Sequence, residues 1–177
     1  ELGFKTMLTE GARHIMGWKN PNYIYNNDYE SRLKLLLRNY SLSDDIAFRF
    51  SNEAWPEWPL TAEKYYHWLK ASEGEIVNLF MDYETFGEHQ GAECGIFDFM
   101  RALPKFIVKD PDMEFVTPSR AATKHKSVGD ISVPEAISWA DEERDLSAWL
   151  GNSLQQDAYN KLCSLQEKLS LIDDAAL

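Results

Sequence analysis

Residues 76–90 read IVNLFMDYETFGEHQ, an apolar run that passes directly into a cluster of acids. The run over residues 76–81 is rich in branched and aromatic side chains, which predicts a strand buried on both faces. Burying carboxylates at the end of such a strand costs free energy of folding unless they pair with another group or take part in binding or catalysis. In barrels of parallel strands, the catalytic residues lie at the C-terminal strand ends. Asp82 is therefore the first candidate for a catalytic residue.

The sequence around this stretch predicts alternating strands and helices. Residues 61–70 form an amphipathic pattern with Thr61 as a plausible N-cap. A second amphipathic helix starts at Ile96, and we expect Pro104 to interrupt it. Strand-like patterns cover residues 4–8, 33–37 and 46–50, with a weaker one over residues 114–117. Strands that alternate with helices favour βα units and a parallel sheet, so the predicted fold class is α/β.

The last third of the chain has a different pattern. Apolar residues recur every three or four positions from Leu146 to Leu169, which predicts a long helix, and Gly151 interrupts the pattern as either a break or a close packing point. We therefore expect two regions. Residues 1–130 would form part of a barrel, and residues 131–177 would form a helical region packed on it.

The composition excludes several classes of protein. Of the 177 residues, 44% are apolar and 27% are charged, which is typical of a globular protein. A formal net charge of −11 argues against nucleic acid as a partner, because binding phosphates requires basic patches. No apolar run approaches the ~20 residues that cross a bilayer, so we expect a soluble protein with no membrane contact. Cys94 and Cys163 have no CxxC spacing, and reduced thiols in a cytoplasmic protein fit them best.

Asp82 and Glu84 are the central pair of the acidic stretch. On a continuing strand both side chains would point to the same face, with Cα atoms about 6.6 Å apart. Such a pair can do acid/base work on a glycosidic bond, for which retaining enzymes need carboxyl groups about 5–5.5 Å apart. It can also hold a divalent metal, or form purely structural ion pairs with Arg49 or Arg101. The residues alone leave these three uses open.

Other side chains are weaker candidates. Metal binding is the rival chemistry, but the possible ligands are irregularly spaced and form no HExxH pattern. His89 fits better as a hydrogen-bond partner or a surface residue than as a lone ligand. Glu10 follows the predicted strand over residues 4–8 and is the best candidate for a second carboxylate facing a cavity. Trp55 and Trp58 lie in a loop bracketed by prolines, where they could stack on a sugar or pack against the fold.

Residues 81–89, MDYETFGEH, resemble the fourth conserved region of glycoside hydrolase family 57, whose core pattern is Asp-x-Glu-x-Phe-Gly. The likeness is greatest to the α-amylase-like members, and it extends over residues 36–40, 42–50, 138–141 and 146–152. The resemblance implies an incomplete (β/α)7 barrel followed by a helical bundle, and a retaining mechanism on α-glucans such as maltooligosaccharides that requires no metal or organic cofactor. Asp82 matches the family's general acid/base. The expected substrate-binding residues are Glu84, His89, Trp139, Asp141 and Glu10.

The resemblance also implies that part of the catalytic machinery lies elsewhere. The family's nucleophilic Glu and its N-terminal His-Gln-Pro string belong to earlier regions, and Glu10 does not match the nucleophile's motif. We therefore expect this chain to be a fragment that is inactive alone and that self-associates through exposed edges. Three alternatives stay open: a non-catalytic glucan-binding or scaffold protein, a 4-α-glucanotransferase or branching enzyme with the same mechanism, and a metal-dependent hydrolase.

Overall fold

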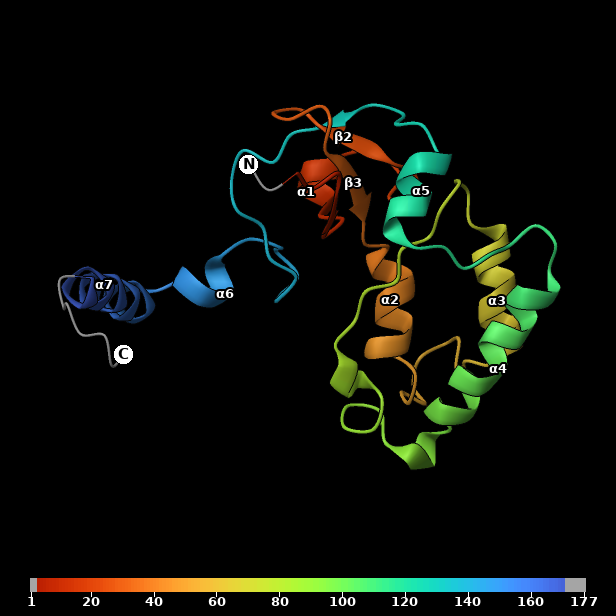
Figure 1. The fold of residues 1–177 in the computed structure, drawn as a ribbon. Helices are drawn as coiled ribbons and strands as arrows, with labels where there is room; N and C mark the ends of the chain where they lie inside the picture. The colour runs from red at the N-terminus through yellow and green to blue at the C-terminus, as the bar shows by residue number, and fades with distance from the viewer. Residues whose placement is uncertain (1–2, 171–177) are drawn as a thin grey trace. The chain divides into compact units, whose positions relative to one another are not determined.

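The computed structural model describes residues 3–170 and contains two compact units. The first unit extends to Ser132 and holds a small mixed sheet with helices around it, and the second starts at Val133 and is helical (Figure 1). The molecule is therefore of the α/β class in its first unit. No helix among the described residues is long and apolar enough to span a membrane.

Four short strands form the sheet: β1 (Thr6–Thr9), β2 (Tyr25–Asn27), β3 (Lys34–Leu37) and β4 (Asp130–Ile131). Their order is β1-β3-β2-β4, with β1 parallel to β3, β2 antiparallel to β3, and β4 parallel to β2. The strands predicted over residues 4–8 and 33–37 correspond to β1 and β3. Because β1 and β4 are its edges, the described sheet is open, and the expected (β/α)7 barrel is not shown.

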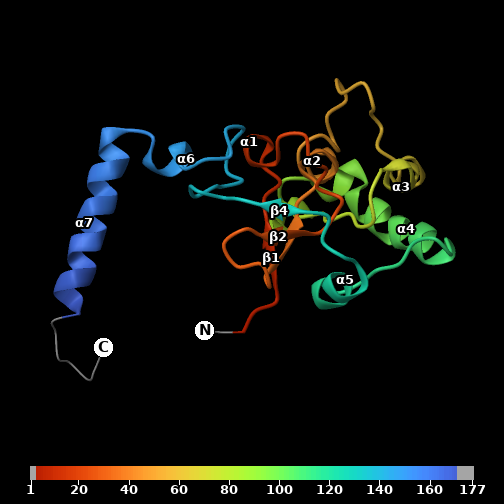
Figure 2. The same ribbon diagram turned by 90° about the horizontal axis from the view of Figure 1, so that it is seen from above.

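Five helices and two 3₁₀ turns belong to the described part of the first unit. They are α1 (Arg13–Met16), α2 (Tyr40–Ala47), α3 (Ala62–Ala71), α4 (Ile96–Lys109) and α5 (Pro118–Lys124), with 3₁₀ turns η1 (Tyr83–Thr85) and η2 (Ala92–Cys94). Figures 1 and 2 show α2 following the arrowhead of β3, with α3 and α4 side by side next to it. The apolar faces of α2, α3 and α4 form the main core around Tyr65, Ile96 and Phe99. The prediction of α3 is confirmed, because the Thr61 side chain caps it by accepting a hydrogen bond from the Lys64 N–H at 3.1 Å.

Two of the predictions around this core are wrong. The strand predicted over residues 46–50 is instead the end of α2 and the turn that follows it. Leu42, Ile46 and Phe50 are four residues apart and all buried, so their spacing is that of one helical face. The predicted interruption at Pro104 does not occur either. Helix α4 runs through it because its buried face packs on α3, and this packing offsets the hydrogen bond that proline cannot make.

Residues 76–81 are extended but do not form the buried strand that was predicted. Their β-type pairing is a single parallel bridge between Arg38 and Asn78. Asn78 is buried and its amide donates to the Leu37 carbonyl at 3.0 Å, whereas the apolar residues of the segment are only partly buried. Side-chain hydrogen bonds thus hold this segment in place of a continuous ladder. The weaker pattern over residues 114–117 forms no strand either.

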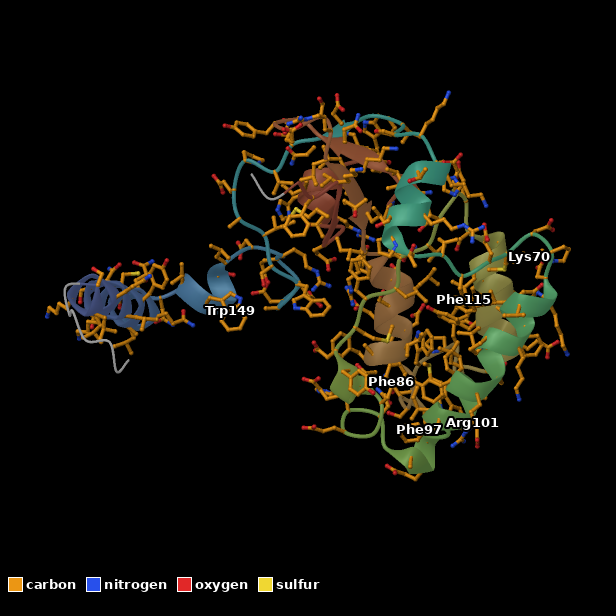
Figure 3. The ribbon with its side chains drawn as sticks, in the orientation of Figure 1. Lys70, Phe86, Phe97, Arg101, Phe115 and Trp149 are labelled. Atoms are coloured by element: carbon orange, nitrogen blue, oxygen red, sulfur yellow. The ribbon has the colours of Figure 1, made fainter. Side chains whose placement is uncertain are left out.

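An ionic link joins the ends of α3 and α4. The Asp110 carboxylate, at the C-terminal cap of α4, accepts hydrogen bonds from the Lys70 ammonium at 2.6 Å and the Tyr66 hydroxyl at 2.7 Å. The hydrogen bond from Lys70, followed by that from Tyr66, lowers the pKa of Asp110 to about 2. Lys70 lies at the end of α3 nearest the α4 terminus (Figure 3). The link therefore stays charged at neutral pH and fixes the two helices relative to each other.

The β1 edge of the sheet is the surface on which the expected self-association depends. β1 pairs with β3 on one side only among the described residues, and the Phe4, Met7 and Leu8 side chains beside it are at least half exposed. An open, apolar edge is a template for pairing with another chain. We expect the 177-residue chain to self-associate in a light-scattering concentration series, and Met7→Lys to weaken the association. Val108→Lys, at an exposed apolar residue of α4, is the control, and a monomer at every concentration would contradict the prediction.

The second unit begins with residues 133–146, which contain no helix or strand. Helix α6 (Ser147–Leu150) and helix α7 (Ser153–Leu169) follow, separated at Gly151, so the interruption there is a break. A capping box starts α7, in which the Asn152 side chain accepts from the Gln155 N–H at 3.0 Å and the Gln155 side chain accepts from the Asn152 N–H at 3.1 Å. The end of the expected helical region, residues 171–177, lies outside the described residues.

Candidate active site

Three extended segments run in the same direction and end side by side in the first unit. β1 and β3 are parallel, and beyond them the Arg38 N–H donates to the Thr9 carbonyl at 2.9 Å. On the other side of β3, the Asn39 N–H donates to the Asn78 carbonyl at 2.9 Å, within the parallel bridge to residues 76–81. The C-terminal ends of the three segments carry Glu10, Arg38 and Asp82.

Arg38 is the centre of a buried ionic cluster at these strand ends. Its side chain is 4% exposed, and its Nη1 lies 3.4 Å from Glu10 Oε2. Its Nη2 donates to Asp44 Oδ1 of α2 at 2.5 Å. The remaining donor, Nε, bonds the main-chain carbonyl of Phe80 at 2.7 Å. One guanidinium therefore connects the ends of β1 and β3, helix α2 and the segment that leads to Asp82.

Both main-chain groups of Phe80 are held by side chains. Its carbonyl accepts from Arg38, and its N–H donates to the Ser43 hydroxyl of α2 at 3.2 Å. Ser43 is itself fully buried and donates to the Asn39 carbonyl at 2.7 Å. The chain is thus fixed two residues before Asp82, although no strand ladder continues there.

Asp82 occupies the N-cap position of η1, where the chain leaves the extended conformation. Its carbonyl accepts from the Thr85 N–H at 3.1 Å, and its side chain is exposed. Among the described residues, no group donates a hydrogen bond to its carboxylate or forms an ion pair with it. A carboxylate held at a fixed main-chain position, without a partner, is open to a ligand.

The expected pairing of Asp82 with Glu84 on one strand face is wrong, because the chain turns into η1 at Tyr83. Glu84 is exposed, and its carbonyl accepts from the N–H groups of Glu88 and His89 at 3.2 and 3.1 Å. The alternative, ion pairs of these acids with arginines, is also wrong. Arg49 pairs with Asp45 at 2.7 Å and Arg101 pairs with Asp98 at 2.8 Å.

The loop after η1 closes on itself and is pinned to α2. The Gln90 N–H donates to the Thr85 carbonyl at 3.0 Å, and its side-chain amide donates to the Ala47 carbonyl at 2.9 Å. Gly87 has a φ of 117°, which disfavours any other residue, and Phe97 of α4 lies next to the loop (Figure 3). His89 lies exposed between these anchors. The loop therefore presents Asp82, Glu84 and His89 on its outside.

The sequence model described as "Glycosyl hydrolase family 57" matches residues 1–134 of this chain, which include every residue of this site. The chain belongs to glycosyl hydrolase family 57. A protein of Methanocaldococcus jannaschii named "Putative alpha-amylase" is 51% identical over 164 residues. The match covers 92% of this chain and 35% of that protein, so the chain spans about a third of the length of its relative. No solved structure matches the chain significantly.

Asp82, Glu84, His89 and Glu10 lie within the residues that the family model matches, whereas Trp139 and Asp141 lie beyond them. The Glu10 side chain is 5% exposed and faces Arg38, so it contributes to the ionic cluster. Contact of Glu10 with substrate stays a prediction, as does that of Glu84 and His89.

Trp139 and Asp141 lie in the second unit, in the loop before α6. Trp139 is about half exposed, and Asp141 accepts from the Arg144 N–H at 3.1 Å and the Ser147 hydroxyl at 3.4 Å. Asp141 therefore has a local role in fixing its loop. Whether either residue belongs to the substrate cleft of this glycosyl hydrolase family 57 chain stays a prediction.

The two loop tryptophans differ in their surroundings. Trp55 packs on the main core, with its ring centroid 6.0 Å from that of Trp68 in an edge arrangement and the Arg49 guanidinium 5.7 Å above it. Trp58 remains partly exposed, at 43%. Packing therefore accounts for Trp55, while contact of Trp58 with a sugar stays a prediction.

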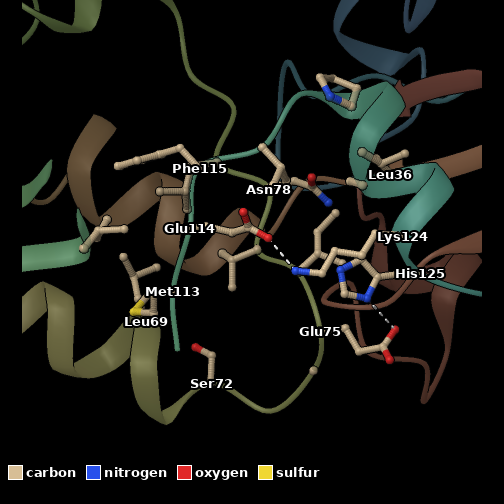
Figure 4. Close-up of a pocket in the computed structure, with 18 of the residues that line it drawn as sticks. Leu36, Leu69, Ser72, Glu75, Asn78, Met113, Glu114, Phe115, Lys124 and His125 are labelled. Carbon is tan, nitrogen blue, oxygen red and sulfur yellow. Dashed lines mark hydrogen bonds and ion pairs between the residues drawn. The ribbon is translucent and has the colours of Figure 1, made fainter. Parts of the chain in front are cut away.

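A cavity of about 710 Å³ lies elsewhere in the first unit, between α5 and residues 72–80 and 112–116. Leu36, Leu69 and Met113 are among its apolar lining residues, and Asp82 does not line it (Figure 4). Two contacts at its wall, drawn in Figure 4, are the ion pair between Lys124 and Glu114 and the approach of His125 Nδ1 to Glu75 Oε2 at 3.3 Å. No group of three or more potential ligands that could hold a metal ion occurs within residues 3–170.

Proposed function

We propose that this chain is part of a retaining glycoside hydrolase that acts on α-glucans, with Asp82 as its general acid/base. Asp82 carries the proposal: its exposed carboxylate follows the third of three parallel segments, and it occupies the Asp position of the motif Asp-x-Glu-x-Phe-Gly. Membership of glycosyl hydrolase family 57 and the name of the M. jannaschii relative support this reaction class.

In the proposed reaction, Asp82 donates its proton to the glycosidic oxygen while a nucleophilic carboxylate attacks the anomeric carbon from the opposite face. The C–O bond to the leaving sugar breaks, and a covalent glycosyl-enzyme forms. Asp82, now a carboxylate, then removes a proton from the water that releases the sugar. The nucleophile would come from a segment outside these 177 residues. Glu84, His89 and Glu10 of the first unit are proposed to bind the glucan, as are Trp139 and Asp141 of the second.

The experiment measures maltooligosaccharide conversion by the longer protein that contains this chain, and by the 177 residues alone. We expect the longer protein to release a product that first appears as the α-anomer, seen by NMR, with activity unchanged by a chelator. We expect the 177 residues alone to have no turnover, because one carboxylate cannot both attack and donate. The β-anomer as first product would contradict retention, and loss of activity with the chelator would favour a metal-dependent hydrolase.

Other outcomes separate the remaining alternatives. Binding of maltooligosaccharides without conversion by the longer protein would indicate a glucan-binding or scaffold protein. Transfer of the glucan to a second glucan, in place of hydrolysis, would indicate a 4-α-glucanotransferase or branching enzyme with the same two carboxylates. A cytoplasmic location also stays a proposal, and the free thiols of Cys94 and Cys163 are consistent with it.

A further inference from the structure

We propose that Arg38 is a positioning residue for Asp82, which fixes the main chain from which the acid/base reaches the glycosidic oxygen. The inference rests on the proposed function of Asp82. It starts from the contact between Arg38 Nε and the Phe80 carbonyl, at 2.7 Å, two residues before Asp82. Since Asp82 has no side-chain partner of its own among the described residues, its main chain sets the point from which the carboxylate extends, and only the side-chain torsions vary about that point.

The main chain before Asp82 depends on these side chains because it lacks a strand ladder. After the bridge at Asn78, both polar main-chain groups of Phe80 are bonded to side chains, the N–H to Ser43 and the carbonyl to Arg38. A shift of about 1 Å at a catalytic group can cost 10²-fold in rate. Asp82 lies two residues beyond Phe80, about 6.6 Å of extended chain, so a displacement of the Phe80 main chain also displaces that of Asp82.

The two carboxylates of the cluster orient the guanidinium. Nη1 faces Glu10 and Nη2 faces Asp44, which leaves Nε directed at the Phe80 carbonyl. Arg38 is 3% exposed, so these contacts are not exchanged for water. The flat fork of arginine can satisfy three directions at once, whereas the ammonium of lysine is a single point of charge that cannot span them. Glu10 and Asp44 therefore act through Arg38.

A purely structural role would have a different signature. If Arg38 acts through Asp82, its replacement affects steps that need proton transfer and spares those that do not. An activated aryl α-glycoside, such as a dinitrophenyl α-maltooligosaccharide, has a leaving group that departs without protonation. General loss of folded protein would instead lower kcat/KM for this substrate and for maltooligosaccharides by the same factor.

The experiment compares kcat/KM for these two substrates in the longer protein. We expect Arg38→Lys to lower kcat/KM for maltooligosaccharides about 10²-fold, which is the effect of a displacement of about 1 Å. For the activated glycoside, kcat/KM should fall less than about threefold. Ser43→Ala removes the hydrogen bond from the Phe80 N–H to the Ser43 hydroxyl and leaves the size of the side chain nearly unchanged. It should also lower kcat/KM more for maltooligosaccharides than for the activated glycoside, with a smaller loss than Arg38→Lys. Arg49→Lys is the matched control, because Arg49 also bonds an aspartate and a main-chain carbonyl but does not contact Phe80.

The outcomes keep this inference separate from the proposed function. Equal losses on both substrates in Arg38→Lys and Ser43→Ala, or no loss in either, would overturn the positioning role while wild type and Asp82→Asn still differ. An active wild type whose Asp82→Asn variant is unimpaired would instead remove the proposed acid/base, and the positioning role with it. If Arg38→Lys does not fold, the comparison of the two substrates in Ser43→Ala alone tests the positioning role.

Discussion

Asp82→Asn is expected to lower kcat for maltooligosaccharides about 10²–10⁴-fold in the longer protein, which is the usual contribution of a general acid/base. Asparagine has nearly the same shape but can neither donate the carboxylic proton nor accept one from water. The fold should be unaffected, since the Asp82 carboxylate bonds no described residue. Kinetics on maltooligosaccharides together with a binding isotherm test this, and the dissociation constant should change little.

Rescue by a small nucleophile is a second test of Asp82 as the general acid/base. Azide can attack the glycosyl-enzyme without a base, so we expect it to restore turnover of an activated glycoside by Asp82→Asn and to yield a glycosyl azide that retains the α configuration. Glu88→Gln is the control, because Glu88 is an exposed carboxylate in the same loop and its substitution should leave kcat within about twofold. Full activity in Asp82→Asn would leave the acidic stretch with a structural role.

The sequence predicts those features of the fold that are local. Helix α3 follows from its amphipathic period and from Thr61, whose capping bond is to a residue three positions away. The break at Gly151 is local as well. The position of Asp82 at the end of an extended segment is predicted from the apolar run before it, and the structure places that segment parallel to β3.

The features that the sequence does not predict depend on long-range packing. The apolar residues of 42–50 fit either a strand or a helix, and their contact with α3 and α4 decides for the helix. Similarly, residues 76–81 have strand composition, but Asn78 and Phe80 bond to side chains of β3 and α2 rather than to a neighbouring strand. The path of α4 through Pro104 follows from its packing against α3.

The site itself is predicted only in part, for the same reason. The exposed acids Asp82 and Glu84 stand out in the sequence because a motif carries them. Arg38, by contrast, is 42 residues from Phe80 in the chain, and Gln90 is 43 residues from Ala47. Nothing in their sequence neighbourhood marks them as the residues that hold the segment and loop around Asp82. Arg38 does lie within a string that resembles the family, so the signal that could have identified it is this resemblance and not its spacing.

Tyr65→Ala is expected to destabilise the protein by about 3–5 kcal/mol, the cost of emptying a large aromatic site in a core. Tyr65 is fully buried, its ring lies edge-on to that of Phe99 with centroids 5.6 Å apart, and its hydroxyl donates to the Leu42 carbonyl of α2 at 2.8 Å. Burial, with a smaller effect of Asp45, raises the pKa of the Tyr65 phenol, so it remains a donor well above neutral pH.

Two further variants separate the ring from the hydroxyl. Tyr65→Phe keeps the ring but removes the donor, and should cost about 1–2 kcal/mol because the buried carbonyl loses one partner. Tyr29→Ala removes a tyrosine that is 96% exposed, and should change stability by less than about 0.5 kcal/mol. Urea unfolding followed by tryptophan fluorescence measures all three. Since Leu42 lies beside Ser43 and Asp44, the core that Tyr65 fills also holds the helix that fixes Phe80. If Tyr65→Ala were no less stable than Tyr29→Ala, the packing of α2 against α3 and α4 would not be the main core of this protein.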